Sequence, residues 1–385
     1  MKKNLQIYVH IPFCVQKCLY CDFLSFAAEE RVQEDYVNAL LEEIRHYGET
    51  MTDYDVTTIY IGGGTPSYVN HVWIETVLAE IYENFSIKPN VEISIECNPG
   101  TLSSWKLGAY KSAGINRLSI GLQSANNEEL KILGRIHTYE DFLKSYEMAR
   151  AAGFDNINVD LMSGLPKQNV TKFLETLYQI IKLRPEHISA YSLIIEKGTP
   201  FYDSYKFDLV KQQAGMKTDF LPSEDEEYRI YKATQEVLKQ NGYVQYETSN
   251  YAQKGYECRH NIGYWTRENY LGVGLGAASL IENVRYTNTS NIDTYMQGEW
   301  VAAEEPITRK AQMEEFMFLG LRMNEGVSRE DFENNFNISI EAIYREPLEE
   351  LKRKELLVAR AGRIFLTDKG RDLSNYCLAK FLLVY

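Results

Sequence analysis

The sequence predicts an α/β protein: a partial parallel (β/α)6 barrel followed by a small C-terminal α+β domain of winged-helix outline. Through the first half of the chain, short β-branched or apolar runs alternate with longer stretches of helical periodicity. Such alternation is typical of a parallel sheet with right-handed crossovers. After residue 305 the pattern changes to helix-like stretches that lead into a short hairpin, which indicates a separate unit.

Six strand-like runs define the predicted barrel. They cover residues 5–11, 57–61, 91–96, 116–120, 156–160 and 187–192. The helical stretches between them cover residues 34–47, 72–85, 103–113, 139–152 and 171–183. Gly114, Gly153 and the Arg184-Pro185 pair follow three of these stretches and predict helix ends there. Because functional groups of such barrels gather at the carboxyl ends of the strands, the residues at those ends are the first candidates for a site.

The chain divides into three expected parts. Residues 1–195 form the barrel, residues 196–304 extend it and include a long helix at 223–240, and residues 305–385 form the C-terminal domain. The hairpin of that domain has its turn at Ala361-Gly362. A winged-helix outline is common in DNA-binding proteins, but the charges of this segment are near balance and shape alone is weak support for a function. We therefore do not assign it to DNA binding.

Net charge and cysteine placement narrow the class of function. The formal net charge of −13 disfavours nucleic acid as the main partner, because a phosphate backbone would be repelled. The sequence shows neither a signal-peptide pattern nor an apolar run of about 18 residues, so we expect a cytoplasmic protein whose thiols stay reduced. Three of the six cysteines fall within eight residues. In that compartment such clustering indicates metal or redox chemistry.

The clustered cysteines are Cys14, Cys18 and Cys21, directly after the first predicted strand. Thiolates are the ligands that hold iron–sulfur clusters, and a cubane cluster normally has four of them. Three thiolates on one loop leave one iron with an open position, as sites of metal chemistry require. The alternatives are three core cysteines or part of a zinc site, although no nearby Cys or His completes a usual zinc knuckle.

Glycines and polar side chains follow the other predicted strands. A GGGTP turn at residues 62–66 follows the second strand, and its glycines allow the backbone to approach a ligand closely. Glu96, Gln123 and Asp160 end the next three strands, and Arg135 lies between the last two of these. Acidic and amide side chains suit hydroxyl and amino groups, while arginine suits a carboxylate. Each residue taken alone is as typical of a cap or an ion pair, but together they predict a ligand site.

These features resemble the radical S-adenosylmethionine superfamily, and more closely the branch that contains oxygen-independent coproporphyrinogen III oxidase and the haem chaperones of the HemW type. The resemblance covers nearly the whole chain. It implies a [4Fe-4S] cluster on Cys14, Cys18 and Cys21, with the open iron taking S-adenosylmethionine. It also implies that S-adenosylmethionine is contacted by Tyr8, Gly63, Gly64, Thr65, Glu96, Gln123, Arg135 and Asp160.

Two positions distinguish the members of this branch. The oxidases typically carry a fourth cysteine two positions after the third, where this sequence has Phe23. Residues 260–265 (HNIGYW) match a motif typical of the haem chaperones, whose histidine, here His260, is implicated in haem binding. The resemblance therefore implies a chaperone that carries haem as cargo to acceptor proteins such as membrane-bound respiratory cytochromes. The alternative is an oxidase that decarboxylates coproporphyrinogen III, so enzymatic activity stays open.

The residues alone give a weaker reason to assign haem to His260. A neutral imidazole is a common axial ligand of haem iron, and the aromatic residues around the motif offer flat apolar surface. The alternative is a buried histidine that is hydrogen-bonded among structural aromatics. The resemblance further implies a homodimer. We expect a cytoplasmic location and leave open an attachment to the inner face of the membrane.

Overall fold

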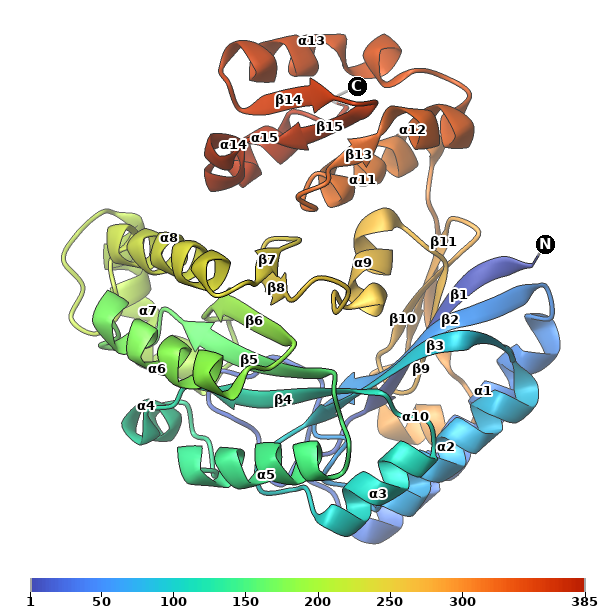
Figure 1. The fold of residues 1–385 in the computed structure, drawn as a ribbon. Helices are drawn as coiled ribbons and strands as arrows, with labels where there is room; N and C mark the ends of the chain where they lie inside the picture. The colour runs from blue at the N-terminus through green and yellow to red at the C-terminus, as the bar shows by residue number, and fades with distance from the viewer. Residues whose placement is uncertain (1, 384–385) are drawn as a thin grey trace.

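The computed structural model describes residues 2–383. Its centre is a twelve-stranded sheet with the order β12-β11-β10-β9-β1-β2-β3-β4-β5-β6-β8-β7 (Figure 1). Strands β1 to β6 are parallel and lie side by side in chain order, which confirms the predicted parallel barrel. The sheet does not close, since β12 and β7 remain at its two edges.

All six predicted barrel strands are present. They are β1 (Lys3–Ile11), β2 (Tyr54–Gly63), β3 (Ser86–Cys97), β4 (Arg117–Gln123), β5 (Ile157–Ser163) and β6 (His187–Ser192). The helices that connect them are α1 (Glu30–Thr50), α2 (His71–Asn84), α3 (Ser104–Ser112), α4 (Asn127–Ile132), α5 (Tyr139–Ala151) and α6 (Val170–Leu183). Only the short helix α4 has no counterpart in the sequence prediction.

Burial explains why these patterns fold as they do. Every residue of β4 is buried, as expected of a central parallel strand that is covered on both faces. Along α1, Tyr36, Leu40 and Ile44 recur at helical spacing and are buried against the sheet. Gly114 and Gly153 have φ angles of 95° and 84°, so the predicted helix ends lie where only glycine is unstrained.

The middle segment extends both edges of the barrel sheet. Its elements are α7 (Pro200–Gln213), α8 (Glu224–Gln240), β7 (Val244–Gln245), β8 (Asn250–Ala252), α9 (Arg259–Thr266), β9 (Tyr270–Val273), β10 (Ala278–Ile281), β11 (Val284–Asn288), α10 (Ile292–Met296) and β12 (Val301–Pro306). Strand β8 pairs antiparallel with β6, whereas β9 returns to the first strand and pairs parallel with β1. Helix α9, which carries the HNIGYW motif, lies between the barrel and the C-terminal domain (Figure 1).

The C-terminal domain has its own core and a three-stranded sheet. Its elements are α11 (Arg309–Gly320), β13 (Val327–Ser328), α12 (Arg329–Phe336), α13 (Ile340–Arg353), β14 (Leu357–Arg360), β15 (Arg363–Leu366), α14 (Asp368–Asp372) and α15 (Ser374–Ala379). Strands β14 and β15 form the predicted hairpin. Ala361 and Gly362 both have positive φ angles, 51° and 76°, as a two-residue hairpin turn of type I′ requires.

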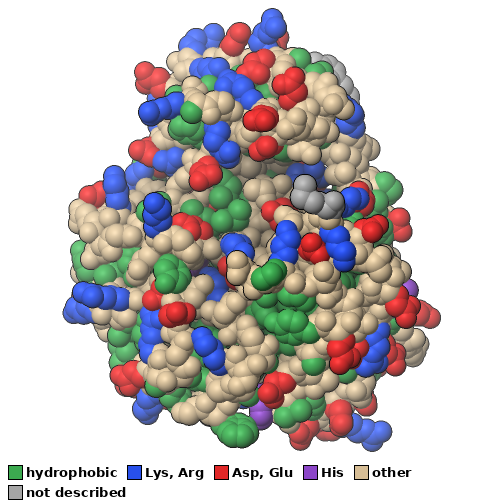
Figure 2. Space-filling model, turned by 45° about the vertical axis from the view of Figure 1, so that its right-hand side comes forward, with side chains coloured by type: hydrophobic (Ala, Val, Ile, Leu, Met, Phe, Trp, Pro, Cys, Tyr) green, Lys and Arg blue, Asp and Glu red, His purple; other side chains and the backbone are tan. Residues whose placement is uncertain are grey.

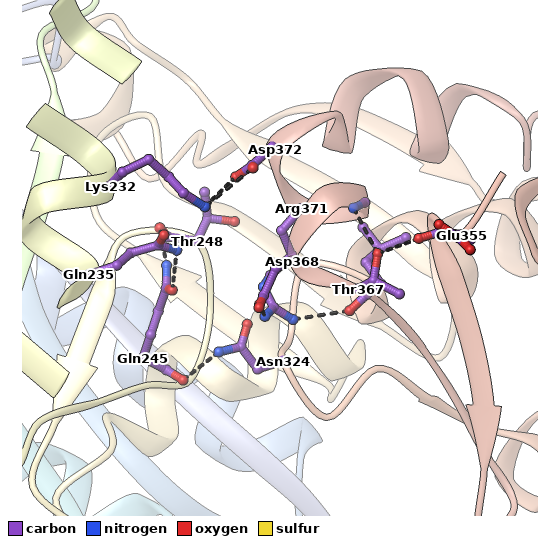
Figure 3. A network of polar contacts seen from close by, with 12 residues as sticks. Lys232, Gln235, Gln245, Thr248, Asn324, Glu355, Thr367, Asp368, Arg371 and Asp372 are labelled. Atoms are coloured by element: carbon purple, nitrogen blue, oxygen red, sulfur yellow. Dashed lines mark hydrogen bonds and ion pairs between the residues drawn. The ribbon is translucent and has the colours of Figure 1, made fainter. Parts of the chain in front are cut away.

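Polar contacts join this domain to the barrel (Figure 3). Lys232 on α8 forms an ion pair of 3.0 Å with Asp372 on α14. The side chain of Asn324 donates a hydrogen bond to the backbone carbonyl of Gln245 in β7. Nearby, the guanidinium of Arg322 lies 5.4 Å from the ring centre of Trp265. The last residue of the HNIGYW motif therefore packs against the C-terminal domain.

Acidic and basic side chains are interspersed over the face shown in Figure 2, and apolar groups lie between them, some side by side near its middle. The net charge of −13 is therefore not gathered in one patch on this face. None of the helices within residues 2–383 combines the length and the apolar character that crossing a membrane demands.

Candidate cofactor site

A cavity of about 530 Å³ opens at the carboxyl ends of the barrel strands. Cys14, Cys18 and Cys21 line it together. The predicted S-adenosylmethionine residues also line it, with the exception of Tyr8: they are Gly63, Gly64, Thr65, Glu96, Gln123, Arg135 and Asp160. The topology thus brings the cysteine loop, the ends of β2, β3 and β4, and Arg135 after α4 to a single cavity, as the parallel arrangement predicts. Asp160, predicted to end its strand, lies instead in the middle of β5 and still lines the cavity.

Backbone hydrogen bonds fix the cysteine loop over the barrel. The amide of Cys14 donates to the carbonyl of Phe26, and the amide of Leu19 donates to the carbonyl of Leu133 after α4. Cys14 is buried, whereas Cys18 and Cys21 are partly exposed to the cavity. In the described part of the chain, no three His, Cys, Asp or Glu side chains converge closely enough to ligate one metal ion. The three thiols instead border a space that is larger than one ion.

The glycine turn after β2 lets the cysteine loop approach the sheet. A Cβ atom on Gly64 would lie 2.8 Å from the carbonyl oxygen of Phe13 and 3.0 Å from the Sγ of Cys14, distances that no ordinary contact shows. Gly63 has a φ of 113°, and a Cβ there would lie 2.6 Å from the ring of His10. The next residue, Thr65, donates a hydrogen bond of 3.4 Å to the Sγ of Cys14. Residues 63–65 of the turn therefore hold the Cys14 thiol in place as well as lining the cavity.

Two of the four carboxylates that line the cavity, Glu96 and Asp160, have raised pKa values. Burial and the neighbouring Asp160 raise the pKa of Glu96 to about 7, against the hydrogen bonds that Glu96 accepts from the Gly63 amide and the Tyr60 hydroxyl. Burial also raises the pKa of Asp160, which accepts hydrogen bonds from Asn158 and Ser119. Both carboxylates are thus held in place by hydrogen bonds, and Glu96 is partly protonated near neutral pH. They can bind hydroxyl or amino groups.

Gln123 and Arg135 complete the far side of the cavity. Gln123 ends β4 with a φ of 74°, an unusual angle for a residue with a side chain, and accepts a hydrogen bond of 2.7 Å from the Tyr191 hydroxyl. Arg135 donates to Asn98 after β3 and to Tyr20 in the cysteine loop, at 3.1 and 2.8 Å. Its buried Nε has no hydrogen-bond partner, which leaves one donor for a ligand.

Two of the predicted site residues lie outside the cavity. The Tyr8 hydroxyl is hydrogen-bonded to the Nδ1 of His10 at 3.1 Å. His260 is only 1% exposed; its Nδ1 lies 2.7 Å from the Thr58 hydroxyl and its Nε2 lies 3.0 Å from the Tyr264 hydroxyl. Burial, together with the nearby Arg117, lowers the pKa of His260 to about 3, so its imidazole is neutral. In this conformation both ring nitrogens are already bonded.

Sequence reasoning missed three residues that build the cavity. Asn98 and Tyr20 both accept from Arg135, and Tyr191 on β6 bonds Gln123. Asn98 directly follows the third strand, as the predicted site residues follow theirs, so the same rule could have found it. Tyr20 lies between two of the cysteines, and nothing in the sequence relates it to a residue more than a hundred positions away.

We expect Glu96→Gln to stabilise the ligand-free protein at about pH 8 by roughly 2 kcal/mol, with little gain near pH 5. Because folding raises the pKa of Glu96 from 4.5 to about 7, the folded chain holds this proton to higher pH than the unfolded chain. Stability is therefore lost as pH rises through that window, and an amide, which does not ionise, avoids the loss. Urea unfolding of both proteins at the two pH values measures the difference.

A matched control is Glu330→Gln, on the exposed start of α12. It should leave the free energy of unfolding unchanged within a few tenths of a kcal/mol at both pH values. If Glu96 contacts S-adenosylmethionine, Glu96→Gln should also weaken binding of that molecule while it stabilises the fold. A gain of equal size at both pH values would contradict the ionisation argument.

Comparison with known proteins places this geometry in a family. The family model described as the radical SAM superfamily matches residues 8–180, and that of the HemN C-terminal domain matches residues 307–373. The haem chaperone HemW of Lactococcus lactis is 37% identical over 100% of this chain and 98% of its own length. The haem chaperone HemW of Escherichia coli K12 is 35% identical over 98% of each chain.

A solved structure extends the likeness to three dimensions. Coproporphyrinogen III oxidase (HemN) from Escherichia coli, described as a radical SAM enzyme, superposes with a TM-score of 0.84 at 25% identity. The match covers 99% of this chain and 90% of the oxidase. It includes the C-terminal domain as well as the barrel. By full-length similarity, the chain belongs to the HemW family of the radical S-adenosylmethionine superfamily.

Proposed function

We propose that this protein is a haem chaperone that binds haem and passes it to acceptor proteins. The observation that carries the proposal is its similarity, over almost its entire length, to relatives named haem chaperones. Phe23 agrees with it, because this exposed phenyl group lines the cavity where the oxidases of the superfamily have a fourth cysteine. The side chain offers apolar contact area and no metal ligand.

Membership of the superfamily implies a [4Fe-4S] cluster and S-adenosylmethionine, and we propose where this chain holds them. The donor set fits a cluster, since three thiols border one cavity and the glycine turn lets the loop that carries Cys14 pack closely against the sheet. The unpartnered Nε of Arg135 fits a ligand carboxylate, and Glu96 and Asp160 fit hydroxyl or amino groups. When both cofactors are bound, they supply one-electron chemistry, while the residues named here bind and orient them.

We further propose that His260 ligates the haem iron. Its neutral imidazole has the correct protonation state for a metal ligand. Since both of its nitrogens are bonded in the described conformation, ligation requires the Nε2 to exchange the Tyr264 hydroxyl for iron. That exchange means a local opening around α9, which packs between the barrel and the C-terminal domain.

Partners and location follow from the same proposal. The acceptors would be haem proteins, such as membrane-bound cytochromes, and a homodimer at the inner face of the membrane would place the chaperone beside them.

A haem-transfer assay tests the function. The protein is reconstituted anaerobically, loaded with hemin, and mixed with increasing amounts of an apo-cytochrome b domain while the visible spectrum is recorded. Delivery by a chaperone gives a transfer rate that rises with acceptor concentration, because the two proteins must meet. Passive release gives a rate that does not depend on the acceptor, and that result would overturn the proposal.

The same preparation distinguishes the oxidase alternative. It is incubated anaerobically with reductant, S-adenosylmethionine and coproporphyrinogen III, and the products are separated by chromatography. We expect no sustained formation of protoporphyrinogen IX. Repeated turnover would assign the protein to the oxidases, whatever its affinity for haem.

A further inference from the structure

A second, smaller chamber lies beneath the cofactor cavity in the barrel interior. Its volume is about 140 Å³, and it shares Tyr60, Ser119, Asp160 and Tyr191 with the wall of the cavity above. We call it the lower chamber; Arg117 from the start of β4 lines it, and Asn250 and Asn261 lie on its opposite side. Asn261 belongs to the HNIGYW motif. None of the roles derived above uses this chamber.

Arg117 is the unusual group in the lower chamber. It is only 2% exposed, and it is among the largest fully buried side chains of the protein. Its Nε has no hydrogen-bond partner, and no carboxylate within residues 2–383 forms an ion pair with it. A buried guanidinium without a counter-charge is costly, so native proteins normally pair it or give it a ligand.

The nearby acidic groups are committed to other partners. Glu92 accepts hydrogen bonds from the backbone amides of Arg259 and His260 at the start of α9, at 3.1 Å each. Asp160 accepts hydrogen bonds from Asn158 and Ser119, and burial raises its pKa. Burial lowers the pKa of Arg117, but the neighbouring Cys258 and Glu92 outweigh it and raise that pKa, so Glu92 acts as a counter-charge at a distance. Neither carboxylate forms a hydrogen bond with the guanidinium.

Other polar side chains at and behind the chamber wall hydrogen-bond to one another. The Oδ1 of Asn158 accepts from Ser189 and bonds the Nδ1 of His187 at 2.6 Å, and the Nε2 of His187 bonds the Tyr246 hydroxyl at 2.8 Å. These side chains are therefore hydrogen-bonded to one another and not to Arg117. The unmet hydrogen-bonding capacity of the chamber is concentrated at Arg117 and at the Oδ1 of Asn250.

We propose that the lower chamber binds a carboxylate group, which pairs with the guanidinium of Arg117. A carboxylate matches the planar donor fork of arginine and supplies the hydrogen-bonded partner that the guanidinium lacks. The amide of Asn261 provides a further donor at the chamber wall, and a bound water or a hydroxyl of the ligand satisfies Asn250. The volume admits a group of the size of propionate, and not a macrocycle.

Two sources supply such a group. One is a free small carboxylate, and the other is a propionate arm of haem bound at His260, whose neighbour Asn261 lines the lower chamber. The carboxylate site itself does not depend on the proposed function. Only the second source rests on haem binding, and the experiment separates the two.

Binding of sodium propionate to the full-length, anaerobically reconstituted protein is measured by calorimetry, with propionamide as the uncharged analogue. Hemin and hemin dimethyl ester are titrated in parallel by visible absorbance. We expect at least one carboxylate to bind about tenfold more tightly than its uncharged analogue, the ratio expected for one charge-assisted hydrogen-bonded pair. If neither pair shows such a preference, the inference is overturned without the use of any variant.

Arg117→Gln should remove the preference for the carboxylate, whereas Arg345→Gln, on the exposed face of α13, should leave it unchanged. If Arg117→Gln fails to fold, Arg117→Lys retains the charge in a less suitable geometry and should weaken binding about tenfold. An unchanged preference in a folded Arg117 variant contradicts the assignment. If propionate binds and hemin does not, the carboxylate site stands and the chaperone function is overturned. If hemin and its dimethyl ester bind equally and propionate does not bind, the chaperone function stands and the carboxylate site is overturned.

Discussion

Replacing Cys18 with serine is expected to leave the protein nearly colourless after anaerobic reconstitution, with bound iron reduced about tenfold from the four atoms of a full cluster. A three-thiolate site has no spare ligand, because the fourth iron must stay open for S-adenosylmethionine. Serine is a poor substitute, since its hydroxyl is far less acidic than a thiol. Iron and sulfide analysis, together with the visible spectrum, measures the loss.

The control is Cys377→Ser in the core of the C-terminal domain. The Sγ of Cys377 lies 3.6 Å from the carbonyl oxygen of Gly370, and a serine hydroxyl can donate to the same acceptor. This variant should bind as much iron as the wild type. Cys18 is only partly buried, so its replacement should not unfold the chain; circular dichroism checks this. A brown Cys18→Ser protein with full iron content would exclude this thiol as a ligand.

The barrel could be predicted from the sequence because its signals are local. The run at residues 187–192 coincides with β6, and the helix at residues 139–152 ends one residue past α5. Residues at or near the predicted strand ends then proved to line much of the cavity, since parallel strands bring their carboxyl ends to one edge of the sheet. That is why Glu96, Gln123 and Asp160 meet although the chain separates them widely.

The remaining features depend on contacts between distant residues. Strand β9 pairs with β1, but its four residues are too few to give a clear periodic signal. An arginine such as Arg117 at the start of a strand is usually exposed, and only the packed barrel shows that it is buried. The motif around His260 could be recognised, but its hydrogen bonds to Thr58 and Tyr264 could not.

His260→Ala is expected to abolish the histidine-ligated haem spectrum and to weaken haem binding by at least about tenfold. The variant also loses stability, by roughly 2–4 kcal/mol, because the ring stacks on Tyr60 at 5.1 Å between centroids and bonds Thr58 and Tyr264. Haem titration must therefore be carried out well below the melting temperature of the variant, with unfolding monitored in the same sample.

Thr58→Val and Tyr264→Phe separate the ligand role from the structural role. Each variant removes one hydrogen bond of His260 and leaves the imidazole in place. If His260 ligates iron through its Nε2, Tyr264→Phe should bind haem at least as tightly as the wild type, because the competing hydroxyl is gone. Thr58→Val should lose stability but keep the ligated spectrum. A purely structural His260 predicts the opposite pattern: haem binding then follows the stability of the three variants, and His260→Ala retains the wild-type spectrum wherever it is folded.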